Sequence, residues 1–152
     1  MNKYYKEIRL LIENNLIEVK KQEISVNNHT LLTYFNVGKL IVEAQGGEKR
    51  AKYGDNLIKE YSKKLTLEFG KFYSEKNLRN MRQFYTTFKI WNSLSSKLTW
   101  THYRYILPIK NESKRNYYIN LAIENRLSVR ELIKEIKNNS YERLIGEKNI
   151  LN

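Results

Sequence analysis

Apolar residues recur along this chain mostly at spacings of three and four, which is the period of an amphipathic α-helix. The alternation of period two that is typical of half-buried strands is nearly absent. We therefore predict an all-α fold, in which a compact multi-helix domain occupies residues 1–145. Residues 146–152 are mostly polar, and we expect them to form a frayed tail.

The first half of the chain predicts three helices, a long one over residues 3–22, a second over 30–45 and a third from about Asp55 to Phe69. The segment 27–29, Asn-Asn-His, is expected to separate the first two helices. Gly46-Gly47 is expected to end the second.

Gly38 lies in the middle of the second of these helices. Glycine in a helix interior is less favourable than alanine by about 1 kcal/mol, so its presence indicates close contact with another helix. The helical period also predicts which side chains face inward. These are Tyr4, Ile8, Leu11, Ile12 and Val19 in the first helix, Leu31, Tyr34, Phe35, Ile41 and Val42 in the second, and Leu57, Ile58, Tyr61, Leu65 and Phe69 in the third.

The segment that follows the third predicted helix is the most informative part of the chain. Gly70 suits the left-handed residue that ends a helix, and Ser74 is a good N-cap for a fourth helix that runs to about Phe88. One sector of this helix carries Leu78, Met81, Tyr85 and Phe88. The remainder carries Lys76, Arg79, Arg82 or Asn80, Gln83 and Thr86. Two helices joined by a turn of this length resemble a helix-turn-helix.

A helix of this kind has the residue types that a major-groove helix requires. Arginine can bridge guanine, asparagine and glutamine can bridge adenine, and lysine can neutralise phosphate. An ordinary surface helix of a basic protein has a similar pattern, and Arg79 and Arg82 could instead pair with Glu75 or with acids elsewhere.

The last third of the chain predicts a loop and three further helices. Ser128 to Glu131 forms a capping box, in which the serine bonds forward and the glutamate bonds back. The expected elements are a loop over 89–98 with a short helical piece, a short helix capped by Thr99 or Thr101 and ended by Pro108, a helix over 111–125, and a last helix from Ser128 to about Asn138.

The net charge of +12, from 28 Lys and Arg against 16 Asp and Glu, predicts attraction to polyanions and salt-sensitive association. Surface lysines of an organism with an AT-rich genome are the alternative explanation. The chain has no cysteine, which excludes disulfides and thiolate metal sites. No apolar run is long enough for a transmembrane helix, and the charged N-terminus is unlike a signal peptide, so we expect a cytoplasmic protein without membrane contact.

Candidate catalytic chemistry is sparse in this sequence. Metal-dependent nucleases need clustered carboxylates, whereas this chain has a single aspartate, Asp55. His29 and His102 are far apart and lie in no zinc-binding pattern. We therefore expect no catalytic residues, no metal site and no cofactor. For His102 a structural role beside a buried tryptophan is favoured over that of a general base.

Six spaced segments of the chain form a recognisable set. They are Tyr34-x-x-x-Gly38-x-x-Ile41, Tyr53-Gly54-x-x-Leu57-Ile58, Phe69-Gly70-Lys71-x-x-Ser74-x-x-Asn77-Leu78-x-x-Met81-Arg82-x-Phe84-Tyr85, Leu98-Thr99-Trp100-Thr101-His102-Tyr103, Ser128-Val129-Arg130-Glu131-Leu132 and Tyr141-Glu142-Arg143-Leu144. In this order they resemble the N-terminal domain of the bacterial YhcG-like proteins over about residues 15–145. The chain departs from the family pattern at Phe72 and Tyr73, where a glycine and an aromatic residue are usual, and at Leu127, where tryptophan is typical.

The resemblance implies a helical domain that binds DNA and precedes a nuclease domain of the PD-(D/E)xK type. No such nuclease domain is expected in these 152 residues, which would be an excised domain or a naturally short relative. The resemblance also implies that Trp100 and His102 belong to a second motif, for packing or for phosphate contact. The complete set of expected nucleic-acid contacts is Lys71, Ser74, Lys76, Arg79, Arg82, Gln83, Trp100, His102 and Arg130.

We expect a non-catalytic module that binds nucleic acid, DNA rather than RNA, through the helix at 75–88. One alternative is a stand-alone inhibitor or protein-interaction module of a mobile element, which blocks the nucleic-acid channel of a defence enzyme such as a CRISPR effector. Its protein partner would then be that enzyme, just as a nuclease would be the partner of a targeting module. A third alternative is a helical oligomerisation domain, for example a homodimer, whose charge is incidental.

Overall fold

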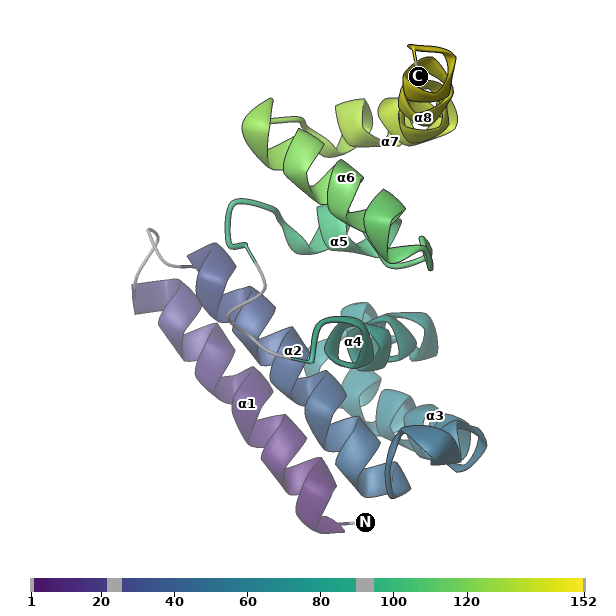
Figure 1. Ribbon diagram of the computed structural model, residues 1–152. Coiled ribbons are helices and arrows are strands. Elements are labelled where there is room, and N and C mark those ends of the chain that lie inside the picture. Colours follow the sequence, from purple (N-terminus) through teal and green to yellow (C-terminus); the bar gives the residue numbers. More distant parts are fainter. Residues whose placement is uncertain (1, 22–25, 90–94, 152) are drawn as a thin grey trace. The chain divides into compact units, whose positions relative to one another are not determined.

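The computed structural model describes residues 2–21, 26–89 and 95–151, and within these ranges the chain forms helices and no strands (Figure 1). The predicted all-α class is therefore confirmed. The chain divides into two compact units, Met1–Ser96 and Lys97–Asn152, where the sequence predicted one domain.

The described part of the first unit contains four α-helices. They are α1 (Asn2–Lys21), α2 (Val26–Gln45), α3 (Ala51–Phe69) and α4 (Glu75–Phe88), with short 3₁₀ helices at Glu48–Arg50 and Lys71–Tyr73. Helix α2 contacts each of the other three, and α1 runs along its side (Figure 1). The fully buried side chains of this unit include Ile8, Ile12, Leu31, Ile41, Ile58, Tyr61, Leu65, Leu78, Met81 and Phe84.

Most of the predicted inward positions in this unit are buried. Tyr4, Leu11 and Phe69 are instead only half-buried, and the side chain of Val19 lies outside the described residues. The predicted break at 27–29 is wrong, because α2 begins at Val26. These polar residues lie in the first turn of a helix, where backbone N–H groups have no intrahelical partner and polar side chains are tolerated.

The helix ends in this unit follow the glycine signals. Gly46 and Gly47 have φ of 92° and 111°, and their N–H groups bond to the carbonyls of Glu43 and Val42. This pair of bonds is the Schellman arrangement, so the predicted end of α2 is confirmed. Gly70 likewise has a φ of 101° at the end of α3. Helix α3 begins at Ala51, four residues before the predicted start at Asp55.

The close helix contact predicted from Gly38 is confirmed. A Cβ atom at this position would lie 2.6 Å from the carbonyl carbon of Met81, and closer still to its oxygen. Because any side chain at position 38 would overlap the backbone of α4, only glycine lets α2 and α4 approach this closely.

The second unit contains α5 (Trp100–Ile106), α6 (Glu112–Glu124), α7 (Val129–Lys137) and α8 (Ser140–Leu151). Thr99 caps α5, and Ser128 and Glu131 form the predicted capping box of α7. The predicted loop at 89–98 falls partly on residues 90–94, which lie outside the described ranges.

Residues 146–151 belong to α8, where the sequence predicted a frayed tail. Contacts with α6 hold this helix at its start. The N–H of Tyr141 donates to the Tyr118 hydroxyl at 3.3 Å, and Lys114 forms an ion pair with Glu142 at 2.6 Å. Both contacts join residues more than twenty positions apart, so local sequence patterns do not indicate them.

Among the residues that the structure describes, three non-glycine residues have a left-handed φ, and each follows the end of a helix. They are Lys89 after α4 (55°), Arg126 after α6 (50°) and Asn139 after α7 (56°). A left-handed residue closes the last turn of a helix, but it is less favourable for residues that carry a Cβ atom.

Replacing Gly38 with alanine is expected to destabilise the protein by about 1–3 kcal/mol, because the added methyl group forces α2 and α4 apart. The matched control is Gly146→Ala in α8, where no atom lies within 4 Å of the added methyl. That change should leave stability unchanged or raise it by up to about 1 kcal/mol. Urea unfolding followed by circular dichroism measures both. Equal effects of the two substitutions would contradict the close approach.

The buried tyrosines predict a loss of stability at alkaline pH. Burial raises the pKa of Tyr61 and Tyr73 to about 12, and it also raises that of Tyr34. A phenol with an unfolded pKa near 10 therefore favours the folded state below pH 10. This contribution is lost as the pH rises through about 12. Helical circular dichroism and phenolate absorbance should then change together, and ordinary titration of all tyrosines with the helices intact would contradict the expectation.

Candidate nucleic-acid interface

The turn before α4 fixes where this helix begins. Tyr73 is buried, and its carbonyl accepts hydrogen bonds from Ser62 at 2.8 Å and Thr66 at 3.4 Å, both on α3. Ser74 then accepts from the N–H of Asn77 at 3.2 Å, which confirms it as the N-cap. The Ser74 hydroxyl, one of the expected nucleic-acid contacts, thus has a structural role at the start of α4.

The inner face of α4 is apolar and anchors the helix to its own unit. Leu78, Met81 and Phe84 are fully buried, and Phe84 meets the ring of Phe35 on α2 edge to face at 6.1 Å between centroids. Tyr85 and Phe88, predicted to share this sector, are half-buried. The orientation of α4 about its axis is therefore fixed by packing.

The outer face of α4 carries four polar residues that share one sector at the helical period: Lys76, Arg79, Asn80 and Gln83. Lys76 and Arg79 are exposed, whereas Asn80 and Gln83 are half-buried. We call this set the α4 outer face. It contains three of the expected contacts, together with the asparagine that the pattern offered as the alternative to Arg82.

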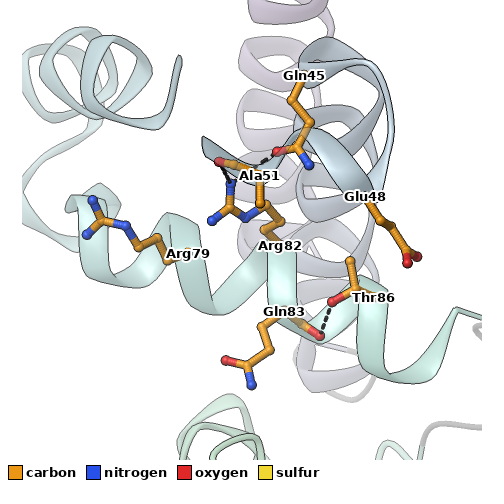
Figure 2. Close-up of a pocket in the computed structure, with 7 residues that line it drawn as sticks. All are labelled: Gln45, Glu48, Ala51, Arg79, Arg82, Gln83 and Thr86. Carbon is orange, nitrogen blue, oxygen red and sulfur yellow. Dashed lines mark hydrogen bonds between the residues drawn. The ribbon is translucent and has the colours of Figure 1, made fainter. Parts of the chain in front are cut away.

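Arg82 does not belong to the α4 outer face, because its guanidinium points toward α3 and the end of α2 (Figure 2). It donates to the side chain of Gln45 at 3.0 Å, to the carbonyl of Ala51 at 3.2 Å and to Asp55 at 2.8 Å. Its side chain is 15% exposed. Three hydrogen bonds within its own unit favour a structural role for Arg82 over base contact, which was the sequence-based expectation.

A glycine makes room for this network. A Cβ atom on Gly54 would lie 2.7 Å from a guanidinium nitrogen of Arg82 and would overlap the side-chain oxygen of Gln45. We call Arg82, Gln45, Asp55 and Gly54 the Arg82 network. It joins the end of α2, the first turns of α3 and the middle of α4, which are distant in sequence.

Arg79 has looser partners than Arg82. It lies 3.3 Å from Glu75 and 3.8 Å from Asp55, and its side chain is 46% exposed. Exposed ion pairs of this kind contribute only about 0–1 kcal/mol each, since water and salt screen them. An incoming phosphate or base could therefore replace these partners at little cost in stability.

A pocket of about 470 Å³ lies between the start of α3 and α4 (Figure 2). On the wall of the pocket, the Thr86 hydroxyl donates a hydrogen bond to the carbonyl of Gln83 at 3.2 Å. Glu48, also on the wall, forms an ion pair with Lys89 at 3.3 Å. Its lining residues are Gln45, Glu48, Ala51, Arg79, Arg82, Gln83 and Thr86. The Arg82 network thus forms one wall of this pocket, and the α4 outer face forms another.

Two other expected contacts are exposed but lie on different elements. Lys71 is in the 3₁₀ turn before α4, within the first unit. Arg130 lies on α7 in the second unit. Both lysine and arginine at exposed positions are suited to phosphate contact, because their charge remains available to solvent.

Trp100 and His102 are both buried, at 7% exposure each. One ring nitrogen of His102, Nδ1, lies 3.1 Å from the N–H of Thr99, and the other, Nε2, lies 2.8 Å from the carbonyl of Leu127. His102 thus takes the place of glutamate in a capping box on α5. Of the two roles expected for this motif, packing and phosphate contact, the geometry favours packing.

No three histidine, aspartate or glutamate side chains come together as a metal site within the part of the chain that the structure describes. Asp55, the single aspartate of the chain, forms an ion pair with Arg82 at 2.8 Å. None of the described helices combines the length and the apolar character needed to cross a membrane.

Sequence reasoning missed Gln45, Asp55 and Gly54 as partners of an α4 arginine. Asp55 was assigned to the helix start, and Gln45 was treated as the end of α2. A signal existed in Gly54, because an isolated glycine inside a helical pattern marks a close approach. Gly38 was interpreted in this way, whereas Gly54 stood too near the expected helix boundary for the same inference.

Replacing Arg82 with alanine is expected to destabilise the fold by about 1–3 kcal/mol, because Gln45 and Asp55 lose a largely shielded hydrogen-bond donor. Arg82→Lys should recover only part of this loss, since a lysine cannot reproduce the fork of donors. Thermal unfolding of the two variants and of Arg79→Ala tests the assignment. A stability of Arg82→Ala equal to that of Arg79→Ala would contradict a structural role for Arg82.

Comparison with known proteins places the chain in a family. A protein of Escherichia coli (strain K12) whose name is "Putative nuclease YhcG" is 36% identical to this chain. The match covers 80% of this chain and 41% of that protein, so the chain spans less than half of its relative. No solved structure matches the chain. The family described as the DUF1016 N-terminal domain matches residues 7–143, through both compact units, and the chain belongs to this family.

Proposed function

We propose that this domain is a non-catalytic nucleic-acid-binding module and that the α4 outer face contacts duplex DNA. The observation that carries the proposal is the separation of the two faces of α4. Leu78, Met81 and Phe84 are fully buried, whereas Lys76 and Arg79 are exposed on the opposite side. A helix anchored in this way can enter a groove without loss of its own packing.

The net charge of +12 supports a polyanionic partner. DNA is favoured over double-stranded RNA because the major groove of B-form DNA is wide enough for an α-helix, whereas that of A-form RNA is deep and narrow. In this proposal α3 and α4 act as a helix-turn-helix-like pair, with α4 in the groove.

Each member of the α4 outer face has a role in this proposal. Arg79 would leave Glu75 and bridge a guanine, Asn80 and Gln83 would bond adenine, and Lys76 would neutralise a phosphate. Arg82 would position α4 through the Arg82 network without contact to DNA. Lys71 and Arg130 would add phosphate contacts.

The relationship to a protein named as a nuclease supports a targeting role. In this role the domain brings DNA to a nuclease domain, which is its protein partner, and performs no hydrolysis itself. The pairing of the single aspartate with Arg82 supports the non-catalytic assignment. A role on chromosomal or invading DNA would place the protein in the cytoplasm.

The test is the binding of a labelled random-sequence duplex, measured by fluorescence anisotropy at about 50 and 200 mM salt. The Lys76→Gln and Arg79→Gln double variant should lower the slope of log affinity against log salt by about 1–2.

The matched control removes two exposed lysines from other helices, through Lys6→Gln on α1 and Lys137→Gln on α7. Both double variants lower the net charge equally, so they separate the effect of the α4 outer face from that of overall charge. Loss of binding in the control to the same extent, or unchanged binding in the α4 variant, would contradict the proposed interface. Tight binding to one protein with weak binding to duplex DNA would favour the inhibitor alternative.

A further inference from the structure

A second basic surface lies on α3, outside the residues considered so far. Lys52, Lys59 and Lys63 are spaced by seven and four residues, which places them on one side of the helix. All three are exposed, and Asn56 lies on the same line. We call these four residues the α3 stripe.

The three lysines of the α3 stripe differ from Lys64, which is the fourth lysine of α3. Lys64 points to another side of the helix, where it pairs with Glu60 at 3.7 Å and lies over the ring of Tyr5 at 5.2 Å. Among the described residues no ion pair involves Lys52, Lys59 or Lys63. The α3 stripe thus carries three lysines along one line that form no ion pair among the described residues, whereas Lys64 is paired with Glu60.

The length of the α3 stripe suits an extended polyanion. Lys52 and Lys63 are eleven positions apart, which corresponds to about 16 Å at 1.5 Å per residue. One strand of B-form DNA advances about 3.4 Å per phosphate along its axis, so this length covers about five nucleotides. Lysine ammonium groups are strongly hydrated point charges on flexible stems, which suits them to phosphates rather than to a single fixed partner.

A hollow beside the α3 stripe leads toward the start of α4. It has a volume of about 490 Å³ and is lined by Lys59, Ser62, Lys63, Thr66, Leu67 and Glu75. Glu75 is the first residue of α4, and its carboxylate lies 3.3 Å from Arg79 of the α4 outer face. A strand held by Lys59 and Lys63 would therefore pass close to the N-terminal turn of α4.

The α3 stripe fits a nucleic-acid backbone better than an acidic protein. Protein interfaces have a desolvated core rich in aromatic residues, and lysine is depleted from it. The large apolar side chain in the hollow is Leu67, which is 86% exposed and has no aromatic neighbour among the lining residues. A surface of three lysines, an asparagine and one leucine offers charge and hydration without such a core.

We propose that the α3 stripe is a second binding surface for the phosphodiester backbone of DNA. Its lysines hold one strand along α3 while the α4 outer face reaches the groove. The inference rests on the proposed function for the nature of the ligand, but the two surfaces share no residue, so that each can be removed without the other.

The experiment compares the full chain with a triple variant, Lys52→Gln, Lys59→Gln and Lys63→Gln. A labelled random-sequence duplex of about two helical turns serves as the probe, again at about 50 and 200 mM salt. Loss of three phosphate contacts should reduce the slope of log affinity against log salt by about 2–3. Affinity should fall at least about 10-fold at the lower salt concentration, where the electrostatic contribution is largest. Circular dichroism establishes that the variant is folded.

The matched control removes three exposed lysines from other helices. They are Lys6 on α1, Lys39 on α2 and Lys137 on α7, each changed to glutamine. The control should keep affinity within about 3-fold of the unmodified chain and a slope reduced by less than about 1. Equal losses in the two triple variants would overturn the α3 stripe in favour of overall charge, as would unchanged binding of the α3 variant.

The α4 variant Lys76→Gln with Arg79→Gln separates this inference from the proposed function. If the α4 variant loses binding and the α3 triple variant does not, the α3 stripe is overturned and the α4 outer face stands. If only the α3 triple variant loses binding, the α3 stripe is supported and the α4 outer face fails. Polyglutamate serves as the protein-like competitor. Its binding to the α3 stripe in preference to the duplex would overturn the assignment to DNA.

Discussion

The contact between Gly38 and the backbone of Met81 determines how α4 is presented. Without a side chain at position 38, α2 and α4 approach until the two backbones touch. That approach buries Leu78, Met81 and Phe84, and it thereby turns the polar side of α4 away from the core. The outward position of Lys76 and Arg79 follows from it. The exposure of Lys76 and Arg79 on the surface therefore depends on the absence of a side chain at position 38 in the interior.

The Arg82 network adds a second constraint, which acts across α3. Gly38 sets how near α4 lies to α2, while Arg82 ties α4 to Asp55 on α3 and to Gln45 at the end of α2. Gly54 makes this possible by leaving room for the guanidinium. The two glycines thus act on the same helix from different neighbours. A mobile α4 would carry the same charges, but it would present them with no fixed direction relative to α3.

The sequence predicted those features that depend on neighbours along the chain. The ends of α2 and α3, the N-cap Ser74 and the capping box at Ser128 each depend on a few adjacent residues, and each is confirmed. The buried faces follow from the helical period for the same reason. The course of α8 was misjudged, because the contacts at its start connect residues far apart in the sequence. The start of α3 was misplaced by four residues, since no side-chain cap marks it.

The same distinction between local and long-range contacts applies to Arg79 and Arg82. They are the same residue type and lie less than one helical turn apart on α4. Only the fold reveals that Arg82 faces Gln45, 37 residues earlier, while Arg79 faces solvent. His102 is a similar case, since its partner, the Leu127 carbonyl, is 25 residues away. The residue types therefore indicated that base and phosphate contacts were chemically possible. The long-range partners determined which of these side chains remain exposed to make them. The left-handed residues after α4 and α6 show that charge and backbone conformation can favour different residue types at one position. Lys89 and Arg126 occupy positions where glycine would be conformationally easier, yet both add positive charge at a helix C-terminus. Glycine at either position would therefore relieve the backbone, but it would also remove a positive charge that the helix C-terminus favours and that belongs to the basic surface of the domain.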